Sequence, residues 1–354
     1  MNRLDRYIIS HILGLTAIVA LALLAIHTFI TFVAELDEAG QGGFGYRQLL
    51  AYTLWLMPSG LYVLLPIVAM LGTLTGLGTL AAQSELTAMR AAGVSLLRIG
   101  TATLGAGLLL GVLCVVLGDW LAPKGQLTAE ALKSEARSGV QAGLGGKTVW
   151  LREGDHVFQI HRLLAEDHFE AAEIYTLGPD LNLQAVTRVE SGRYVDGIWK
   201  FRGVRRTEFG AQNARVVERA GMDWSGTLSP DVLRLFVLEA EALSTGGLLR
   251  LIRYLQQNDL DTSAYTLALA RKVVAPLTVM AMMLFAIPFV LGPLRTSGAG
   301  QRLFVGVLIG LAFYVINEVT ANTGQLYGWN PLVSAAAPTL AFALIALWRL
   351  TDTN

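Results

Sequence analysis

Long apolar stretches separated by short polar ones make up both ends of this chain. The first uncharged run covers the 28 residues Tyr7–Ala34, the second extends from Gln48 to about Leu80, and a third occupies Leu96–Leu121. A helix needs about 20 apolar residues to cross a membrane, so each run can span one. The second run is too long for one crossing and too short for two with a turn. It therefore predicts a single long helix that protrudes on both sides.

Three more spans are predicted in the last part of the chain. Val273–Leu294 forms the fourth, and the run Leu303–Trp348 carries one charge, Glu318. The segment Gly324–Pro331 is rich in turn residues and divides that run into two spans. No small-residue cleavage site closes the first run, which we therefore interpret as a retained span and not as a removed signal peptide.

Basic residues in the short loops predict the orientation, because Lys and Arg concentrate on the cytoplasmic side. One side would hold seven of them and the other three. The seven are Arg3, Arg6, Arg90, Arg98, Arg295, Arg302 and Arg349; the three are Arg47, Arg271 and Lys272. We expect both termini and the loop that contains Arg90 to be cytoplasmic.

The polar interval between the third and fourth spans is then extracytoplasmic. It contains short β-like runs with glycine-containing turns, namely Thr148–Leu151, Val157–Ile160, Glu173–Thr176, Ile198–Phe201 and Ala214–Val217. Such runs predict a β-sandwich or jelly roll. We expect residues 1–122 to form three spans, 123–262 the β domain and 263–354 three more spans. The two triplets would have inverted topology, an arrangement frequent in transporters.

A short amphipathic helix, at about residues 80–93, is predicted between the second and third spans. Glu85 is the first acidic residue after 37 uncharged ones, Leu86 and Met89 share one face, and Gly93 is a helix-ending residue. This helix is either a docking element for a soluble partner or an ordinary interfacial loop helix.

Composition excludes several classes of protein. The chain is 53% hydrophobic, has a formal net charge of +0 and contains one cysteine, Cys114, so neither a soluble globular protein nor a nucleic-acid binder is expected. No metal-ligand spacing of histidines and no Gly-x-Ser-x-Gly motif occurs, and Gly143–Thr148 lacks the first glycine of a phosphate loop. We expect no metal site, no cofactor and no catalytic site in this chain.

Several motifs, in order along nearly the whole chain, carry a resemblance to a known family. They are Leu4-Asp-Arg-Tyr-Ile, Ala39-Gly-Gln-Gly, Gly76-Leu-Gly-Thr-Leu-Ala-Ala-Gln-Ser-Glu-Leu, Trp120-Leu-Ala-Pro-Lys-Gly, Leu228-Ser-Pro-Asp and Gly292-Pro-Leu-Arg. The sequence resembles the lipopolysaccharide-export permeases LptF and LptG, and the first two motifs are more similar to LptG.

The resemblance implies an integral membrane α-helical protein with six transmembrane helices (3+3) and an inserted periplasmic all-β jelly-roll-like domain. It implies a subunit of an ATP-binding-cassette exporter in the inner membrane of a Gram-negative bacterium, which extracts lipopolysaccharide from the outer leaflet and passes it to a periplasmic bridge. The implied partners are an LptF-like permease, a dimer of an LptB-like ATPase that would hold the ATP and Mg²⁺, and an LptC-like membrane-anchored protein.

The resemblance also implies a role for the helix around Glu85, the coupling helix that binds the ATPase. Carried over residue by residue, its sites are Ser84, Glu85, Leu86, Met89, Arg90 and Gly93. Glu85 would lie in a basic groove of the ATPase, and Leu86 and Met89 would be apolar anchors.

The lipid headgroup contacts cannot be copied from relatives. The outer end of the first span, basic in relatives, carries Glu35, Asp37 and Glu38 here. Other candidates for contacts with the headgroup are Arg47, Lys124, Lys133, Arg271 and Lys272. The alternative is that these five residues are solvated charges at the membrane interface. Glu318 is either a gate or partner contact, paired with Arg271 or Lys272, or an interfacial acid within reach of water.

The outer ends of spans one, two and five would line a cavity for acyl chains. Candidate liners are Phe29, Phe32, Leu61, Leu65 and Tyr314, although such residues more commonly pack between helices. Two alternatives remain at this point. A membrane-anchored scaffold or signalling protein would have no stable ATPase partner, and a secondary carrier is disfavoured because buried charge is sparse.

Overall fold

The computed structural model describes residues 3–40, 43–138, 148–165, 167–180, 182–210, 213–226, 228–236, 238–291 and 298–352. The chain forms two compact units. One comprises Met1–Ile30, Met57–Ala122 and Thr266–Asn354, and the other Thr31–Leu56 and Pro123–Tyr265. Residues 31–56, expected with the spans, thus belong to the unit that contains the sheet. The Gly292–Arg295 motif and residues 143–147 of the loop that resembles a phosphate loop lie outside the described residues.

Six helices in the described part of the chain are long and apolar enough to cross a membrane, which confirms the predicted number of spans. They are built from α1 (Arg3–Ala34), α2 (Tyr46–Ala82), α4 (Leu96–Val116), α8 (Ser263–Leu291), α9 (Ala299–Leu326) and α10 (Pro331–Asp352). The second span is one continuous helix of 37 residues despite Pro58 and Pro66. The third continues from α4 through a π-helical turn, η2 (Leu117–Leu121), into α5 (Ala122–Ser138).

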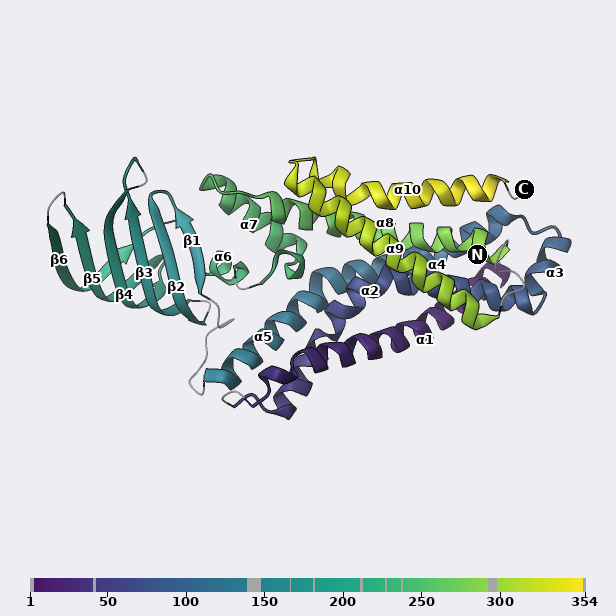
Figure 1. The fold of residues 1–354 in the computed structure, drawn as a ribbon, viewed down its shortest axis with the longest axis horizontal. Helices are drawn as coiled ribbons and strands as arrows, with labels where there is room; N and C mark the ends of the chain where they lie inside the picture. Colours follow the sequence, from purple (N-terminus) through teal and green to yellow (C-terminus); the bar gives the residue numbers. More distant parts are fainter. Residues whose placement is uncertain are drawn as a thin grey trace. The chain divides into compact units, whose positions relative to one another are not determined.

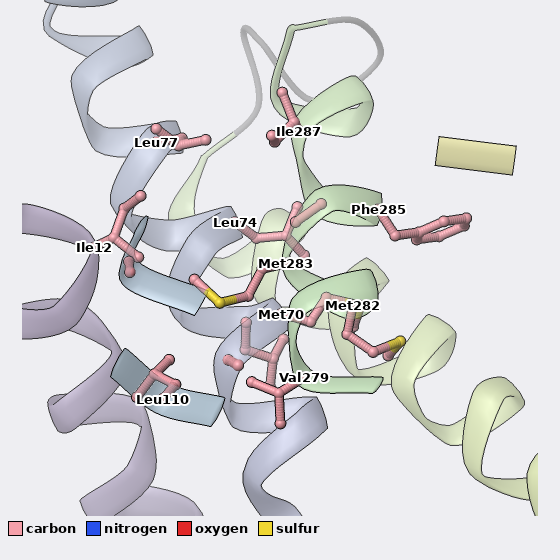
Figure 2. Packing of buried hydrophobic residues seen from close by; sticks show 14 of the residues in the cluster. Ile12, Met70, Leu74, Leu77, Leu110, Val279, Met282, Met283, Phe285 and Ile287 are labelled. Carbon is pink, nitrogen blue, oxygen red and sulfur yellow. The ribbon is translucent and has the colours of Figure 1, made fainter. Parts of the chain in front are cut away.

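The helical unit has an extended apolar core, and a smaller apolar cluster joins α8, α9 and α10. Figure 2 shows Met70 and Leu74 of α2 close to Val279 and Met283 of α8. Cys114 of α4 is also part of this core and is only 1% exposed. Figure 1 shows the N-terminus, the C-terminus and the short helix α3 (Glu85–Ala91) at the same end of this unit.

Glycines allow α1 and α2 to approach closely. A Cβ atom on Gly72 would lie 2.0 Å from the hydroxyl oxygen of Thr16, and one on Gly76 would lie 3.1 Å from the Cα atom of Ile12. Small residues spaced one turn apart let helix backbones pack against each other in a membrane, where no hydrophobic effect drives them together. The Gly72–Gly76 pair therefore holds the end of α2 that leads to α3 against α1.

The second unit contains six antiparallel strands in the described part of the chain, which pair in sequential order (Figure 1). They are β1 (Val149–Glu153), β2 (His156–Ala165), β3 (His168–Leu177), β4 (Leu183–Val195), β5 (Ile198–Phe209) and β6 (Ala214–Trp224). The sequence predicted parts of all except β4. An inserted β domain is thereby confirmed in coarse form, as one described sheet and not as the two sheets of a sandwich.

One face of the sheet carries an aromatic core. Phe158, Phe169, Trp199 and Phe201 are each 2% exposed or less and form one buried cluster. Leu233 of α6 (Pro230–Leu235) belongs to the same cluster, so this short helix covers part of that face. The remaining helical segments of this unit are η1 (Leu36–Glu38), η3 (Ala240–Ala242) and α7 (Thr245–Gln257).

Two indole groups fix the end of this core. Trp199 donates its Nε1–H to the carbonyl oxygen of Leu228 at 2.8 Å, and Trp224 donates to Oε2 of Glu153 at 2.9 Å. The backbone N–H of Leu228 donates to the other oxygen of Glu153 at 3.1 Å. Glu153 therefore joins the end of β1 to the end of β6 and to the segment that follows, which keeps the sheet strongly curved.

A row of interruptions crosses the sheet at one level. The paired residues run Ile160–Ala172 and then Arg162–Glu170, so the pair His161–Ala171 is missing, and the pair Glu190–Gly203 is missing in the same way between β4 and β5. Ala171 and Gly203 have positive φ angles, 55° and 62°. Such a conformation turns the peptide groups away from the ladder without changing the register.

Candidate functional site

The candidate coupling segment folds as a short helix with defined ends. Ser84 has a φ of 62° and separates α2 from α3. At the other end Gly93 has a φ of +88°, its N–H donates to the carbonyl of Arg90, and the N–H of Val94 donates to that of Met89. These two bonds form a Schellman motif, which favours glycine because of the left-handed conformation. The local sequence therefore determines the C-terminal boundary of α3, whereas the left-handed Ser84, which makes no side-chain capping bond, marks the other.

The two faces of α3 differ from the expected arrangement. Leu86 is only 3% exposed and packs in the core of the helical unit, where Met89 is half-buried against it. Leu86 therefore packs mainly within this chain, and its role as an apolar anchor for a partner stays a prediction. The exposed face carries Ser84, Thr87 and Arg90 instead.

A cavity of about 380 Å³ lies beside α3. It is lined by residues of α3 and of the ends of α2 and α8, namely Ala81, Leu86, Thr87, Arg90, Ala91, Val290 and Leu291. Its wall combines one guanidinium with small and apolar groups, so a protruding side chain of a partner fits it better than a charged cofactor.

Glu85 contacts the N-terminal part of the chain. The phenolic O–H of Tyr7 in α1 donates to Oε2 of Glu85 at 2.8 Å. Two residues before Tyr7 in α1, Asp5 forms an ion pair of 3.2 Å with Arg98 of α4. Sequence analysis missed this role of α1, although the motif Leu4-Asp-Arg-Tyr-Ile contains both contacting residues.

Lys133 lies in α5, after the third span, but its ammonium group is not available to a lipid headgroup. Its ammonium group lies 2.7 Å from Oε2 of Glu35 and 2.5 Å from Oε2 of Glu38, and it lies over the ring of Tyr52. The side chain is only 14% exposed. Two carboxylates therefore neutralise the cation, which corrects its expected role as a phosphate ligand.

Lys272 and Arg271 of α8 contact two different neighbours. The Nζ atom of Lys272 donates to the carbonyl oxygen of Gly118 in the π-helical turn at 2.5 Å and lies 3.8 Å from Asp119. Arg271 forms an ion pair of 2.7 Å with Glu318 of α9. Lys272 is 7% exposed, so the expectation that it meets a headgroup needs correction too. Of the two partners considered for Glu318, the geometry selects Arg271.

Arg47 and Lys124 are the headgroup candidates that stay exposed. Among the candidate cavity liners, Phe29 and Tyr314 are 67% and 46% exposed on the helical unit. Leu65, in contrast, is 1% exposed within the core, so it lines no open cavity in this conformation. Leu61 and Phe32 are half-buried, each against the core of its own unit.

The described residues contain no group of three or more His, Cys, Asp or Glu side chains placed to hold a metal ion. The described geometry offers a surface helix beside long apolar helices, with partly buried ion pairs between helices.

The family model for the lipopolysaccharide export system permease LptF/LptG matches residues 6–352. The chain belongs to the LptF/LptG family. Among relatives, the lipopolysaccharide export system permease protein LptG of Escherichia coli (strain K12) is 29% identical over 352 residues, with 98% of this chain and 97% of the relative covered. The protein of the same name from Haemophilus influenzae (strain ATCC 51907 / DSM 11121 / KW20 / Rd) is 30% identical over 353 residues, 99% of each chain.

Membership of the LptF/LptG family confirms the resemblance that the motifs predicted. It identifies the chain as a permease subunit of lipopolysaccharide export and fits a protein without a catalytic site of its own. Six apolar helices together with LptG relatives indicate a multi-pass protein of the inner membrane.

Proposed function

We propose that this LptF/LptG-family chain is the membrane-spanning subunit of an ATP-binding-cassette exporter. It extracts lipopolysaccharide from the outer leaflet of the inner membrane and passes it to a periplasmic bridge. It does so in a heterodimer with an LptF-like permease, on a dimer of an LptB-like ATPase that holds ATP and Mg²⁺, with an LptC-like protein at the membrane.

The end of the helical unit that carries α3 and both termini is the cytoplasmic end in this proposal. The excess of arginine in the loops at that end supports the orientation. The β domain is then periplasmic, and as a jelly-roll-like domain it passes the lipid on toward the periplasmic bridge. The two triplets of helices have inverted topology and enclose the lipid path, with the exposed Phe29 and Tyr314 as its wall.

The observation that carries the proposal is the geometry of α3. A helix of seven residues between two spans is ended by the glycine motif at Gly93 and held by one buried leucine, while its opposite face stays exposed. An isolated helix of this length is unstable in water, so packing must hold it in place. Holding a short polar helix at the membrane surface is useful to a chain that transmits force from a soluble partner.

Co-purification tests this proposal. The complex is isolated from detergent with wild-type chain, Glu85→Ala or Glu85→Arg, and the bound ATPase and the release of lipopolysaccharide from proteoliposomes are measured. We expect Glu85→Arg to release the ATPase, because it places a cation against a basic groove, and Glu85→Ala to weaken binding. Asp180→Arg is the matched control, since Asp180 is exposed and lies in a turn between β3 and β4.

Purification of the wild-type chain without any ATPase would contradict the proposal and support the scaffold alternative. Retention of the ATPase by both Glu85 variants would instead remove the anchoring role of Glu85 and leave the family membership intact. A lipid release that depends on an ion gradient and not on ATP would favour the secondary carrier.

A further inference from the structure

The N-terminal motif Leu4-Asp-Arg-Tyr-Ile lies against the coupling helix. Tyr7 and Glu85 are 78 residues apart in sequence, yet the phenol donates a hydrogen bond of 2.8 Å to the carboxylate. Leu4 packs against the same apolar cluster that contains Leu86 and Leu96. The start of α1 therefore contacts α3 through a polar bond and lies on the core that supports it.

A second polar contact fixes the start of α1 to the next helix. Asp5 in the first turn of α1 pairs with Arg98 in the first turn of α4, at 3.2 Å. Carboxylates stabilise helix N-termini and cations destabilise them. Asp5 therefore stabilises the N-terminus of α1. Its pairing with Arg98 also offsets the unfavourable interaction of that arginine with the N-terminus of α4, so the ion pair stabilises the contact between the two helix starts.

We propose that Tyr7 is a positioning residue for the ATPase contact of Glu85, and that Asp5 and Arg98 hold the helix start that carries it. The inference rests on the proposed function, because it needs an ATPase that binds Glu85. The hydrogen bond occupies Oε2 of the carboxylate. It leaves Oε1, at a fixed orientation, to accept a bond from a cationic side chain of the partner.

The chemistry of tyrosine explains why this residue suits the position. A phenol donates one hydrogen bond and is neutral near pH 7. A lysine or arginine at position 7 would also bind Glu85 but would neutralise the charge that the partner recognises. A neutral donor orients the carboxylate and leaves its full negative charge, which makes the charge-assisted bond to the partner strong.

Tyr7→Phe tests the inference, since it removes one oxygen atom and keeps the ring that packs at the start of α1. In the purified complex we expect ATPase dissociation to become about threefold to tenfold faster, because loss of the orienting bond removes only part of the contribution of Glu85 to binding. Lipopolysaccharide released per ATP hydrolysed falls as well. Tyr46→Phe is the matched control, because it also removes one hydroxyl group, from a tyrosine at the start of α2 that is 72% exposed.

A double-mutant cycle separates positioning from a structural effect. If Tyr7 acts through the carboxylate, Tyr7→Phe has no further effect on ATPase dissociation in a Glu85→Ala background. An equal effect in both backgrounds would overturn the inference, and so would wild-type behaviour of Tyr7→Phe in a complex that Glu85→Ala weakens. In contrast, absence of the ATPase from the wild-type preparation would contradict the proposed function itself.

The ion pair offers an independent test by charge exchange. Asp5→Arg alone places two cations together and is expected to weaken ATPase binding, whereas Asp5→Arg with Arg98→Asp restores the attraction and recovers binding. Failure of the double variant to recover any binding, with the complex still folded by its thermal unfolding profile, would overturn the part assigned to Asp5 and Arg98.

Discussion

At the scale of single residues, charges near the membrane are paired within the chain. Lys133 lies between Glu35 and Glu38, and Arg271 lies against Glu318. An isolated charge in a low-dielectric region is costly, so each cation that is taken from water requires a carboxylate or a carbonyl group near it. The acidic residues that follow α1 are thus explained in part by the lysine that they bind.

Substitution of Lys133 tests this pairing. We expect Lys133→Ala to lower the free energy of unfolding by about 1–3 kcal/mol, because two half-buried carboxylates then repel each other without a cation between them. Thermal unfolding of the detergent-solubilised protein measures the effect. Lys124→Ala is the control, since Lys124 is exposed and its loss changes the stability by less than about 0.5 kcal/mol.

Lys133→Ala and Lys124→Ala also distinguish a structural role of Lys133 from a role in lipid binding. Binding of phosphate-bearing lipid by Lys133 would reduce lipid affinity in Lys133→Ala at unchanged thermal stability, and that result would contradict the assignment made here. Lys124, which is exposed, is the better candidate for such an effect.

Residue roles were predictable from sequence only where the pattern was local. The helix-ending position of Gly93 follows from its place after an amphipathic run, and the structure gives it the left-handed conformation. The partner of Tyr7 is 78 residues away, so no local pattern contains it. The inward direction of Leu86 was not predictable either, because a two-residue apolar face packs equally well against its own chain or against a partner.

At the scale of elements, the apolar helices were easier to predict than the strands. A span of about 20 apolar residues has almost no alternative structure. Strand β4 was missed because its core-facing positions include Ala185, Thr187 and Gly192, which are weakly hydrophobic. The packing of these small residues against larger neighbours, such as Gly192 beneath the ring of Phe169, is a tertiary feature.

The interruption across the sheet leads to a prediction for Gly203. We expect Gly203→Ala to destabilise the β domain by about 1–3 kcal/mol, because its φ is +62° and a Cβ atom would lie 2.2 Å from Oε2 of Glu190. Hydrogen exchange of peptides from β4 and β5 in the intact protein measures the loss.

Gly246→Ala is the matched control for that substitution. Gly246 lies exposed in the first turn of α7, and no atom lies within 4 Å of its added Cβ. Alanine is favoured over glycine in a helix, so the control should leave β4 and β5 unchanged. Equal exchange in Gly203→Ala and wild type would show that the sheet absorbs the extra methyl group.

The curved sheet also predicts a dependence on pH. Burial lowers the pKa of His156, whose ring lies 4.7 Å from that of Trp224; Arg206 adds to this effect, while Asp155 and Glu153 oppose it. The folded chain therefore binds fewer protons at His156 than the unfolded chain does. The contribution of His156 to the free energy of unfolding is full above the ordinary histidine pKa of about 6.5. It is lost as the pH falls from there through the lowered value.

A second group acts in the same direction at lower pH. A hydrogen bond from Tyr175, together with Arg188, lowers the pKa of Glu173, so its contribution is lost below the ordinary range of a glutamate. Hydrogen exchange of β1, β2 and β6, corrected for its intrinsic pH dependence, should show weaker protection at pH 5.5 than at 7.5. His156→Gln should reduce that difference more than His161→Gln does, and an unchanged slope in His156→Gln would contradict the assignment.

At the scale of the whole molecule, membership of the LptF/LptG family accounts for the combination of six apolar helices and an inserted β domain. The number and order of these parts could be predicted from the alternation of apolar and polar segments. The inclusion of residues 31–56 in the unit with the sheet could not, since it results from contacts of α5 with the segment that follows α1, such as the bond from the N–H of Gly43 to the carbonyl of Ala136.

The burial of Cys114 makes the natural chain suited to thiol labelling. It is the single cysteine in the sequence and is 1% exposed within the helical core. A maleimide in water cannot reach it while the helices remain packed, so the wild-type surface is already free of reactive sulfur. A fluorophore or spin label can therefore be attached at one introduced cysteine without first removing the native one. The rate at which Cys114 itself reacts would then measure how often the helix bundle opens.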